Sequence, residues 1–96
     1  MIIKPTVGRV VLFTPSVNDP TRQLAPGPQA AIVCYVHGDR MVNLAVFDAN
    51  GRTYPASSVT LVQEGDEKPD QGYYAEWMPY QKAVAKGEIP PTLHKS

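Results

Sequence analysis

The chain has 96 residues, enough for one domain with one hydrophobic core. Nine Lys and Arg balance nine Asp and Glu, and this formal charge of zero excludes the broad basic field that supplies most non-specific affinity for nucleic acid or an anionic membrane. The hydrophobic share of 43% argues against a wholly disordered chain, and ten Pro with seven Gly argue against a mostly helical one.

The first third of the chain predicts two strands joined by a long loop. Residues 7–14 are rich in β-branched side chains and end before Pro15, which cannot donate to a strand ladder. Residues 15–29 contain four prolines among polar residues, and this loop is longer than the usual length of about 4–6 residues, which predicts a working or mobile loop. Residues 30–36 form a continuous apolar run, which is typical of a central strand buried on both faces.

Two hairpin turns follow. Residues 37–40 contain Gly38, which can take the positive φ that tight hairpins require. Residues 41–47 then alternate in polarity, as a strand with two different faces does. Residues 48–51 end in Asn-Gly, the pair that favours the type I′ turn between two antiparallel strands.

The order of these elements predicts the fold class. Residues 52–54 predict a short returning strand, and residues 59–63 predict the last of five strands. An SH3-like barrel has this order of elements: a strand, a long loop, three strands joined by hairpins, a corner and a short strand. Such a barrel removes exposed strand edges by closing the sheet. We therefore predict a mainly β fold with a small five-stranded SH3-like barrel over residues 1–64; an open five-stranded sheet is the alternative.

The composition changes twice after the predicted barrel. Residues 65–72 are acidic and rich in turn residues, which predicts a flexible connector. Residues 73–96 begin with four of the chain's eight aromatic residues. Pro79 in a first helical position and Gly87 as a cap predict a short helix over residues 79–86, followed by a loose tail.

Cys34 is the only cysteine, so an internal disulfide and a metal site built on paired cysteines are excluded. Its apolar neighbours predict a buried, inert thiol. The first residues lack the charged segment and long apolar stretch of a signal peptide, and no apolar run approaches the roughly 20 residues that span a bilayer. We therefore expect a cytoplasmic protein that does not bind a membrane and has no metal or other cofactor.

Five segments carry a further pattern: Lys4-Pro-Thr-Val-Gly-Arg-Val10, Ala31-Ile-Val33, Met41-Val-Asn-Leu-Ala-Val-Phe47, Ser57-Ser-Val59 and Tyr74-Ala-Glu-Trp77. Together they resemble a group of small uncharacterised bacteriophage-encoded proteins, over most of residues 4–80. The resemblance implies an accessory factor in the infected host cell: an inhibitor of a host enzyme, an antagonist of bacterial immunity or a minor assembly factor. The group has no established activity, so the resemblance assigns no functional residue.

The aromatic segment has two interpretations. In the first, Trp77 and one or two tyrosines close the open end of the barrel as a lid, because about 60 residues alone bury a marginal core. In the second, the rings form a stacking platform or an interface anchor, since they offer a large rigid area with a polar tip. Both can hold at once. The rings are Tyr73, Tyr74, Trp77 and Tyr80.

Four polar residues are further candidates for ligand or partner binding. Arg9 and Asn43 lie within otherwise apolar strands, so each either faces solvent or forms a dedicated polar site. Arg22 lies in the long loop and Arg40 in a hairpin. Arginines beside tyrosines suit a phosphate-bearing ligand, because the guanidinium pairs with phosphate while the rings stack on a base. Plain exposure on the surface is the alternative for each.

No set of side chains predicts catalysis. His37 and Asp39 flank Gly38 in a turn, with no nucleophile, orienting group or pocket, so a solvated turn is the better interpretation. His94 lies in the tail without a carboxylate cluster, which does not predict a metal site. We therefore expect that the protein is not an enzyme.

The function predicted from these features is a non-catalytic binding module that acts on a host factor through the long first loop and the aromatic segment, with self-association into a homo-oligomer. The alternative is an anti-defence protein, a homo-oligomeric sponge that sequesters a nucleotide-type immune signalling molecule in pockets between copies, because one small barrel is filled by its own side chains. The second alternative, a nucleic-acid-binding module, is disfavoured by the zero net charge and the acidic connector.

Overall fold

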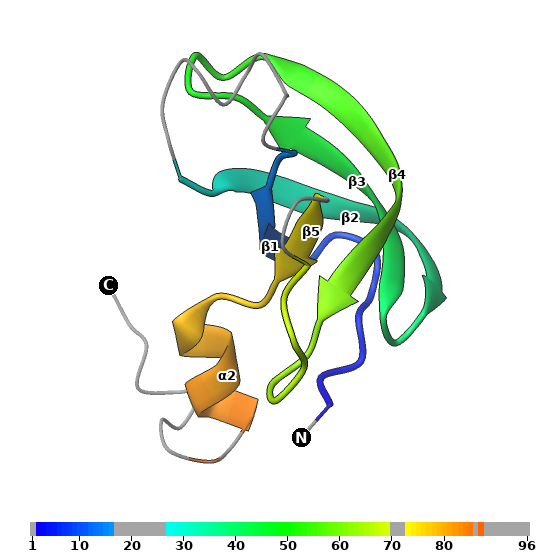
Figure 1. Ribbon diagram of the computed structural model, residues 1–96, viewed down its shortest axis with the longest axis vertical. Helices are drawn as coiled ribbons and strands as arrows, with labels where there is room; N and C mark the ends of the chain where they lie inside the picture. Colours follow the sequence, from blue (N-terminus) through cyan, green and yellow to red (C-terminus); the bar gives the residue numbers. More distant parts are fainter. Residues whose placement is uncertain (1, 17–26, 70–72, 86, 88–96) are drawn as a thin grey trace.

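The computed structural model describes residues 2–16, 27–69, 73–85 and 87, and these residues form five strands and one helix. The strands form one closed barrel in the order β1-β2-β3-β4-β5, and the helix lies at its lower end in Figure 1. The predicted mainly β fold, a small SH3-like barrel with a short C-terminal helix, is confirmed. The elements are β1 (Val10–Thr14), β2 (Gln29–Gly38), β3 (Met41–Phe47), β4 (Thr53–Val62), β5 (Tyr74–Glu76) and α2 (Pro79–Ala85).

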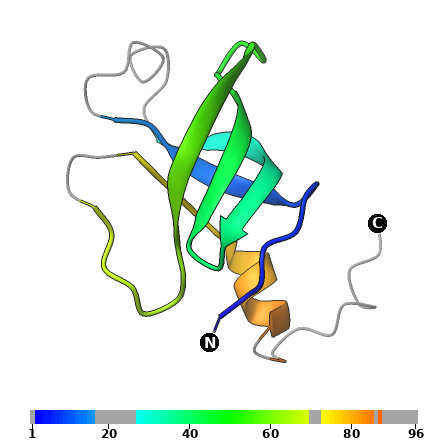
Figure 2. The ribbon, with the colours of Figure 1, turned by 90° about the vertical axis from the view of Figure 1, so that its right-hand side faces the viewer.

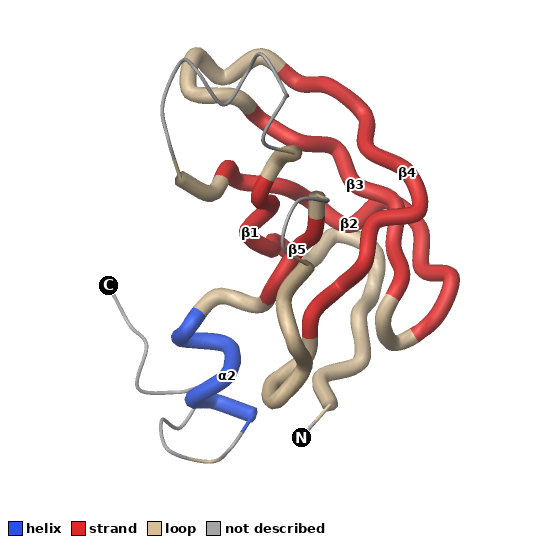
Figure 3. The backbone as a smooth tube through the Cα atoms, in the orientation of Figure 1, coloured by secondary structure: helices blue, strands red, loops and turns tan. Residues whose placement is uncertain are grey.

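Strand β5 closes the barrel. It pairs antiparallel with β1, where Ala75 lies opposite Phe13, and parallel with β4, where Ala75 lies opposite Leu61. The other neighbouring strands pair antiparallel. Figure 3 shows β1 and β5 side by side, with the curved strands β2, β3 and β4 around them. Closure gives β1 a partner on both sides, which removes an edge that a short strand would otherwise expose.

Alternating apolar side chains fill the barrel. In β3, the side chains of Val42, Leu44 and Val46 are buried and those between them are more exposed, the period of two that a strand imposes. Trp77, directly after β5, is 1% exposed and is the bulkiest of the fully buried residues. The core comprises Val11, Phe13, Ala31, Val33, Val42, Leu44, Val46, Val59, Leu61, Ala75 and Trp77.

The fourth and fifth strands differ from the prediction. Residues 52–54 and 59–63 were expected as two strands, but Thr53–Val62 is one continuous strand. It bends where Ser58 takes a φ of 53°, next to a register shift in its pairing with β3, and this bend replaces the predicted corner. The fifth strand is Tyr74–Glu76, so the barrel extends beyond residue 64.

Strand β2 lies between β1 and β3, as predicted, but it is not buried on both faces. A register shift between Val33 and Tyr35 turns both Cys34 and Tyr35 toward the surface. The prediction of a buried Cys34 thiol is therefore wrong: the residue is exposed, and its Sγ lies 3.5 Å from the Ile32 carbonyl oxygen.

Strand β1 begins at Val10, later than predicted, because Val7 and Gly8 form a turn in which Gly8 has a φ of 96°. The backbone nevertheless continues alongside β2: the Gly8 N–H donates to the Val33 carbonyl over 2.8 Å, and the Val33 N–H donates to the Arg9 carbonyl over 2.8 Å. Arg9 is therefore held at the end of the barrel by its backbone, which leaves its side chain exposed.

Gln63 ties the N-terminal segment to the barrel. Its side chain is buried, with 1% exposure. Its Oε1 accepts a hydrogen bond from the Ile3 N–H at 3.0 Å, and its Nε2 donates to the carbonyl oxygens of Ile3 at 3.0 Å and Asp39 at 2.8 Å. One amide thus satisfies three backbone groups, from the N-terminal segment and from the β2–β3 turn.

The C-terminal part of the chain contains the predicted helix. Pro79–Ala85 confirms that prediction over the described residues. Most of the predicted long loop, the end of the connector and the tail lie outside the described residues. In the described ranges, no helix is both long and apolar enough to cross a membrane.

Replacing Gln63 should test how the barrel holds the N-terminal segment. We expect Gln63→Ala to lower the free energy of unfolding by about 2–4 kcal/mol, because three partly buried backbone hydrogen bonds are lost. Urea denaturation measures the change. Lys4→Ala, an exposed position in the same segment, is the control and should stay within about 0.5 kcal/mol of the unsubstituted protein. A Gln63→Ala variant as stable as the control would contradict this role.

Candidate functional site

Three of the eight predicted site residues meet at the end of the barrel beside α2. Arg9 is the residue before β1, and Trp77 is the residue after β5. Tyr80 lies in the first turn of α2. The Arg9 guanidinium carbon lies 5.9 Å from the centroid of the Trp77 ring, within the distance of about 6 Å at which a cation is attracted to the face of an aromatic ring. Residues distant in sequence thus form one site.

Trp77 belongs to the core, as the lid interpretation predicts. Its indole Nε1 is buried and has no hydrogen-bond partner among the described residues. A buried donor without an acceptor costs about 1–3 kcal/mol, so the ring is held by packing and by the cation over it. Because Trp77 is inside, it supports the exposed Arg9 from below and does not itself offer a surface for stacking.

A groove of about 270 Å³ opens between the N-terminal segment and α2, and we call it the Arg9 groove. Figure 2 shows the N-terminal segment passing α2 at the lower end of the barrel. Half of the residues that line the groove are aliphatic, and the others supply one aromatic ring, one amide and a single charged side chain. The lining residues are Ile3, Arg9, Tyr80, Gln81, Val84 and Ala85.

Gln81 holds α2 in place, and the sequence analysis missed it. Its Oε1 accepts a hydrogen bond from the Met78 N–H at 2.8 Å, and its Nε2 donates to the Val10 carbonyl at 2.9 Å. A Gln in the third helical position that reaches back to the residue before the helix is half of a capping box, and this spacing was the available signal. The same amide joins α2 to β1 and so fixes one wall of the groove against Arg9.

The charge on Arg9 has no ion-pair partner among the described residues. Three other cationic side chains among the described residues have ion-pair partners. The nitrogen-to-oxygen distance is 2.9 Å from Arg40 to Asp66, 3.3 Å from Lys68 to Glu76 and 3.8 Å from Lys82 to Glu76. Glu76 thus pairs with Lys82, the lysine of α2. The side chain of Arg9 remains available to an anion from outside.

Arg40 is a structural residue in this fold. Its guanidinium donates two hydrogen bonds to the Asp66 carboxylate, at 2.9 and 3.3 Å, and Asp66 also accepts the Gln63 N–H at 3.0 Å. The hydrogen bonds from Arg40 and from the Gln63 backbone lower the pKa of Asp66, and the same pair raises the pKa of Arg40. The connector predicted to be flexible is therefore anchored at Asp66.

Asn43 also has a structural role. Its Oδ1 accepts hydrogen bonds from the Ser58 N–H at 2.8 Å and from His37 Nε2 at 2.9 Å, so it holds the bend of β4 where Ser58 has positive φ. Because both partners share one acceptor oxygen, Nε2 of His37 carries the proton. His37, expected in a solvated turn, lies at the end of β2. Its ring meets the Tyr35 ring edge-on, with 4.9 Å between the ring centroids.

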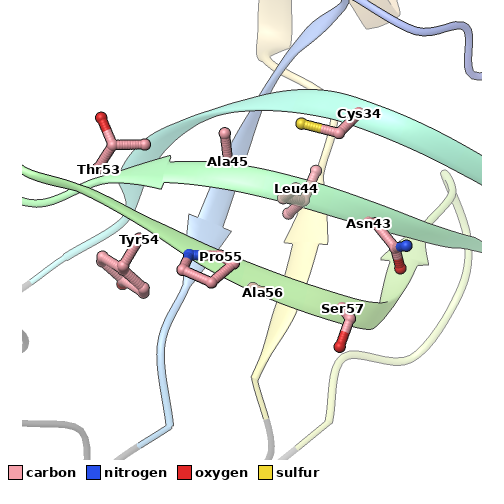
Figure 4. A pocket seen from close by; sticks show the side chains of 9 residues that line it. All are labelled: Cys34, Asn43, Leu44, Ala45, Thr53, Tyr54, Pro55, Ala56 and Ser57. Atoms are coloured by element: carbon pink, nitrogen blue, oxygen red, sulfur yellow. The ribbon is translucent and has the colours of Figure 1, made fainter.

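A second depression, of about 370 Å³, lies on the outer face of the sheet near Asn43. Figure 4 shows its lining side chains on three adjacent strands, with Cys34 on β2, Leu44 and Ala45 on β3 and Pro55 on β4. Four of the nine lining side chains carry a hydroxyl or amide group, and none is charged. This surface therefore lacks the charge that the Arg9 groove has.

The remaining predicted residues do not join the Arg9 groove. Tyr73 is exposed, packs on Phe13 with ring centroids 5.8 Å apart, and donates to the Ser57 carbonyl at 3.3 Å, beside a separate depression of about 330 Å³ that Tyr54 also lines. Tyr74 is a partly buried residue of β5. Arg22 lies outside the described residues.

The described ranges contain no group of three or more His, Cys, Asp or Glu side chains placed to hold a metal ion. No protein-family model, curated protein or solved structure matches the chain.

The Arg40–Asp66 pair should make stability depend on pH. The lowered pKa of folded Asp66 means that the pair stabilises the protein above the ordinary value of 3.8 and loses this effect as the pH falls through the folded pKa. Urea unfolding of the wild type and of Asp66→Asn should therefore differ at pH 7 and converge on acidification below about pH 3.8. A difference that stays constant from pH 7 to pH 2 would show that Asp66 acts without its charge.

The clamp of Asn43 on Ser58 can be tested by substitution on both sides. We expect Asn43→Ala to cost about 1–2 kcal/mol of unfolding free energy, because the Ser58 N–H loses its acceptor. Ser58→Gly should raise stability by about 0.5–1 kcal/mol, since glycine takes positive φ without strain. The control Ser57→Gly, one residue earlier in the same strand, should destabilise. Equal effects of the two glycine substitutions would contradict strain at Ser58.

Proposed function

We propose that the protein is a non-catalytic binding module that engages a partner protein through the Arg9 groove. The observation that carries the proposal is the exposed Arg9 cation, held over the buried Trp77 ring at 5.9 Å and unpaired among the described residues, at an otherwise uncharged groove. Arg, Tyr and Trp are the residue types that most often dominate the binding energy of protein interfaces.

The size of the groove favours a side chain of a partner over a small molecule. Its volume of about 270 Å³ is at the lower limit of the range of about 300–1,000 Å³ that is usual for small-molecule pockets. A nucleotide-type signalling molecule would need further walls from a second copy of the chain. The aliphatic walls and the single cation instead suit an anchor residue, because an anchor needs one shaped pocket and one charge to orient it.

The resemblance to small bacteriophage-encoded proteins suggests a host factor as the partner, met in the cytoplasm of the infected cell. We also propose that the long first loop, which contains Arg22, takes part in binding the partner. Catalysis has no support in the described site, because no nucleophile and no paired acid and base converge there. Self-association stays a proposal that light scattering can test.

Affinity capture from a bacterial host lysate tests the proposed function. A partner retained by the wild-type protein should be lost from Arg9→Ala, with binding weakened roughly 30-fold or more if Arg9 is a dominant contact. Arg52→Ala is the matched control, because it removes an equal charge from an exposed turn at the other end of β3 and β4. Trp77→Ala is unsuitable as a probe, since it should unfold the core at a cost of about 3–5 kcal/mol.

Three outcomes would overturn the proposal. In the first, Arg9→Ala and Arg52→Ala retain the partner equally well. In the second, both lose it, which would indicate attraction by net charge rather than by the groove. In the third, heating the purified protein releases a nucleotide in molar amounts and no partner protein is captured, which would favour the sponge.

A further inference from the structure

We propose that the group bound in the Arg9 groove is the C-terminal residue of the partner chain, with its carboxylate on Arg9 and an aliphatic side chain against α2. This inference rests on the proposed function and adds the chemistry of the partner.

The charge in the groove matches one carboxylate. The guanidinium fork pairs with a carboxylate through two parallel hydrogen bonds, and a carboxylate carries the single negative charge that one Arg neutralises. Sites that recognise phosphate groups in proteins usually gather several arginines, whereas the lining residues include one cation and no second. The one lysine of α2, Lys82, already pairs with Glu76, with 3.8 Å between Nζ and Oε1.

Arg9 is held in position before any ligand arrives. Its backbone is hydrogen-bonded to Val33, and its guanidinium lies over the Trp77 ring. Fixing a flexible side chain on binding costs about 0.5–1.5 kcal/mol, so an arginine that is already restrained loses less.

The walls of the groove suit an aliphatic side chain. Ile3 comes from the N-terminal segment, and Val84 and Ala85 come from α2. The amide of Gln81 is engaged at both ends, by Met78 and Val10, so its acceptor oxygen is not offered to a ligand. The polar recognition therefore depends on Arg9.

The volume favours a chain end over an internal acidic residue. One terminal residue supplies a carboxylate and a side chain together, within a groove of about 270 Å³. An internal Asp or Glu needs a second residue for the aliphatic contact, and its backbone must continue past the groove in both directions.

Titration with small probes tests this inference by NMR. Trp77 is the only tryptophan, so its indole N–H gives a single signal, which can be followed together with the separate signal of the Arg9 Nε–H. We expect N-acetyl-leucine to shift both signals with a dissociation constant in the millimolar range, as suits a ligand of its size. N-acetyl-leucinamide, which has the same shape without the charge, should bind at least tenfold more weakly, and N-acetylglycine, which lacks the side chain, should also bind more weakly.

Variants of the groove give a second arm of the test. Ala85→Glu places a negative charge, the same as that of the probe's carboxylate, at an exposed lining position and leaves Arg9 and Trp77 in place. It should abolish the shifts caused by N-acetyl-leucine. Thr60→Glu adds the same charge at an exposed position of β4 and is the matched control, which should leave them unchanged. Equal binding of the acid and the amide would overturn the carboxylate assignment, and so would inorganic phosphate binding more tightly than N-acetyl-leucine.

A further comparison distinguishes a carboxylate at the chain end from one on an internal side chain. N-acetyl-leucyl-glutamyl amide presents an internal acidic residue, and tighter binding of this peptide than of N-acetyl-leucine would overturn the assignment of a chain end. The inference and the proposed function can fail separately. Loss of partner capture in Arg9→Ala with no response to N-acetyl-leucine would overturn only the inference. Binding of N-acetyl-leucine with capture unaffected by Arg9→Ala would overturn the proposed function, and with it the assignment of the groove to the partner's chain end, while the carboxylate chemistry of the groove would stand.

Discussion

The insertion of β5 between β1 and β4 is the constraint on which the rest of this structure depends. Three residues close the barrel by pairing antiparallel on one side and parallel on the other, which brings Ala75 and then Trp77 into the core. Without this strand, β1 would be an exposed edge and the core would lose its bulkiest fully buried residue. The C-terminal segment is therefore part of the barrel and not an appendage to it.

Closure also builds the candidate site. Because Trp77 follows β5 directly, its ring is fixed at the end of the barrel, where the turn at Gly8 delivers Arg9 above it. The chain then has only Met78 before α2 begins, so the helix must pack beside Arg9, and Gln81 holds it against β1. The position of the cation is a consequence of how the barrel closes.

Two of the candidate residues show why polar side chains in strands are ambiguous. Asn43 interrupts an apolar strand and could have faced a ligand, but its oxygen holds the strained bend at Ser58. Arg40 could have bound an anion from outside, but Asp66 of the same chain neutralises it. Arg9 differs because no described carboxylate reaches it, and this difference singles it out for the proposed function.

Local patterns in the sequence determined the mainly β fold, both hairpins and the helix start at Pro79, because strand alternation, turn residues and helix caps act over a few neighbouring residues. Only the tertiary structure decided which segment closes the barrel, that a register shift exposes Cys34, and that Gln63 binds Ile3 sixty residues away. It also decided that Arg9 meets Trp77. Such contacts form between segments that are distant in the sequence. They therefore produce no local periodic pattern from which they could be predicted.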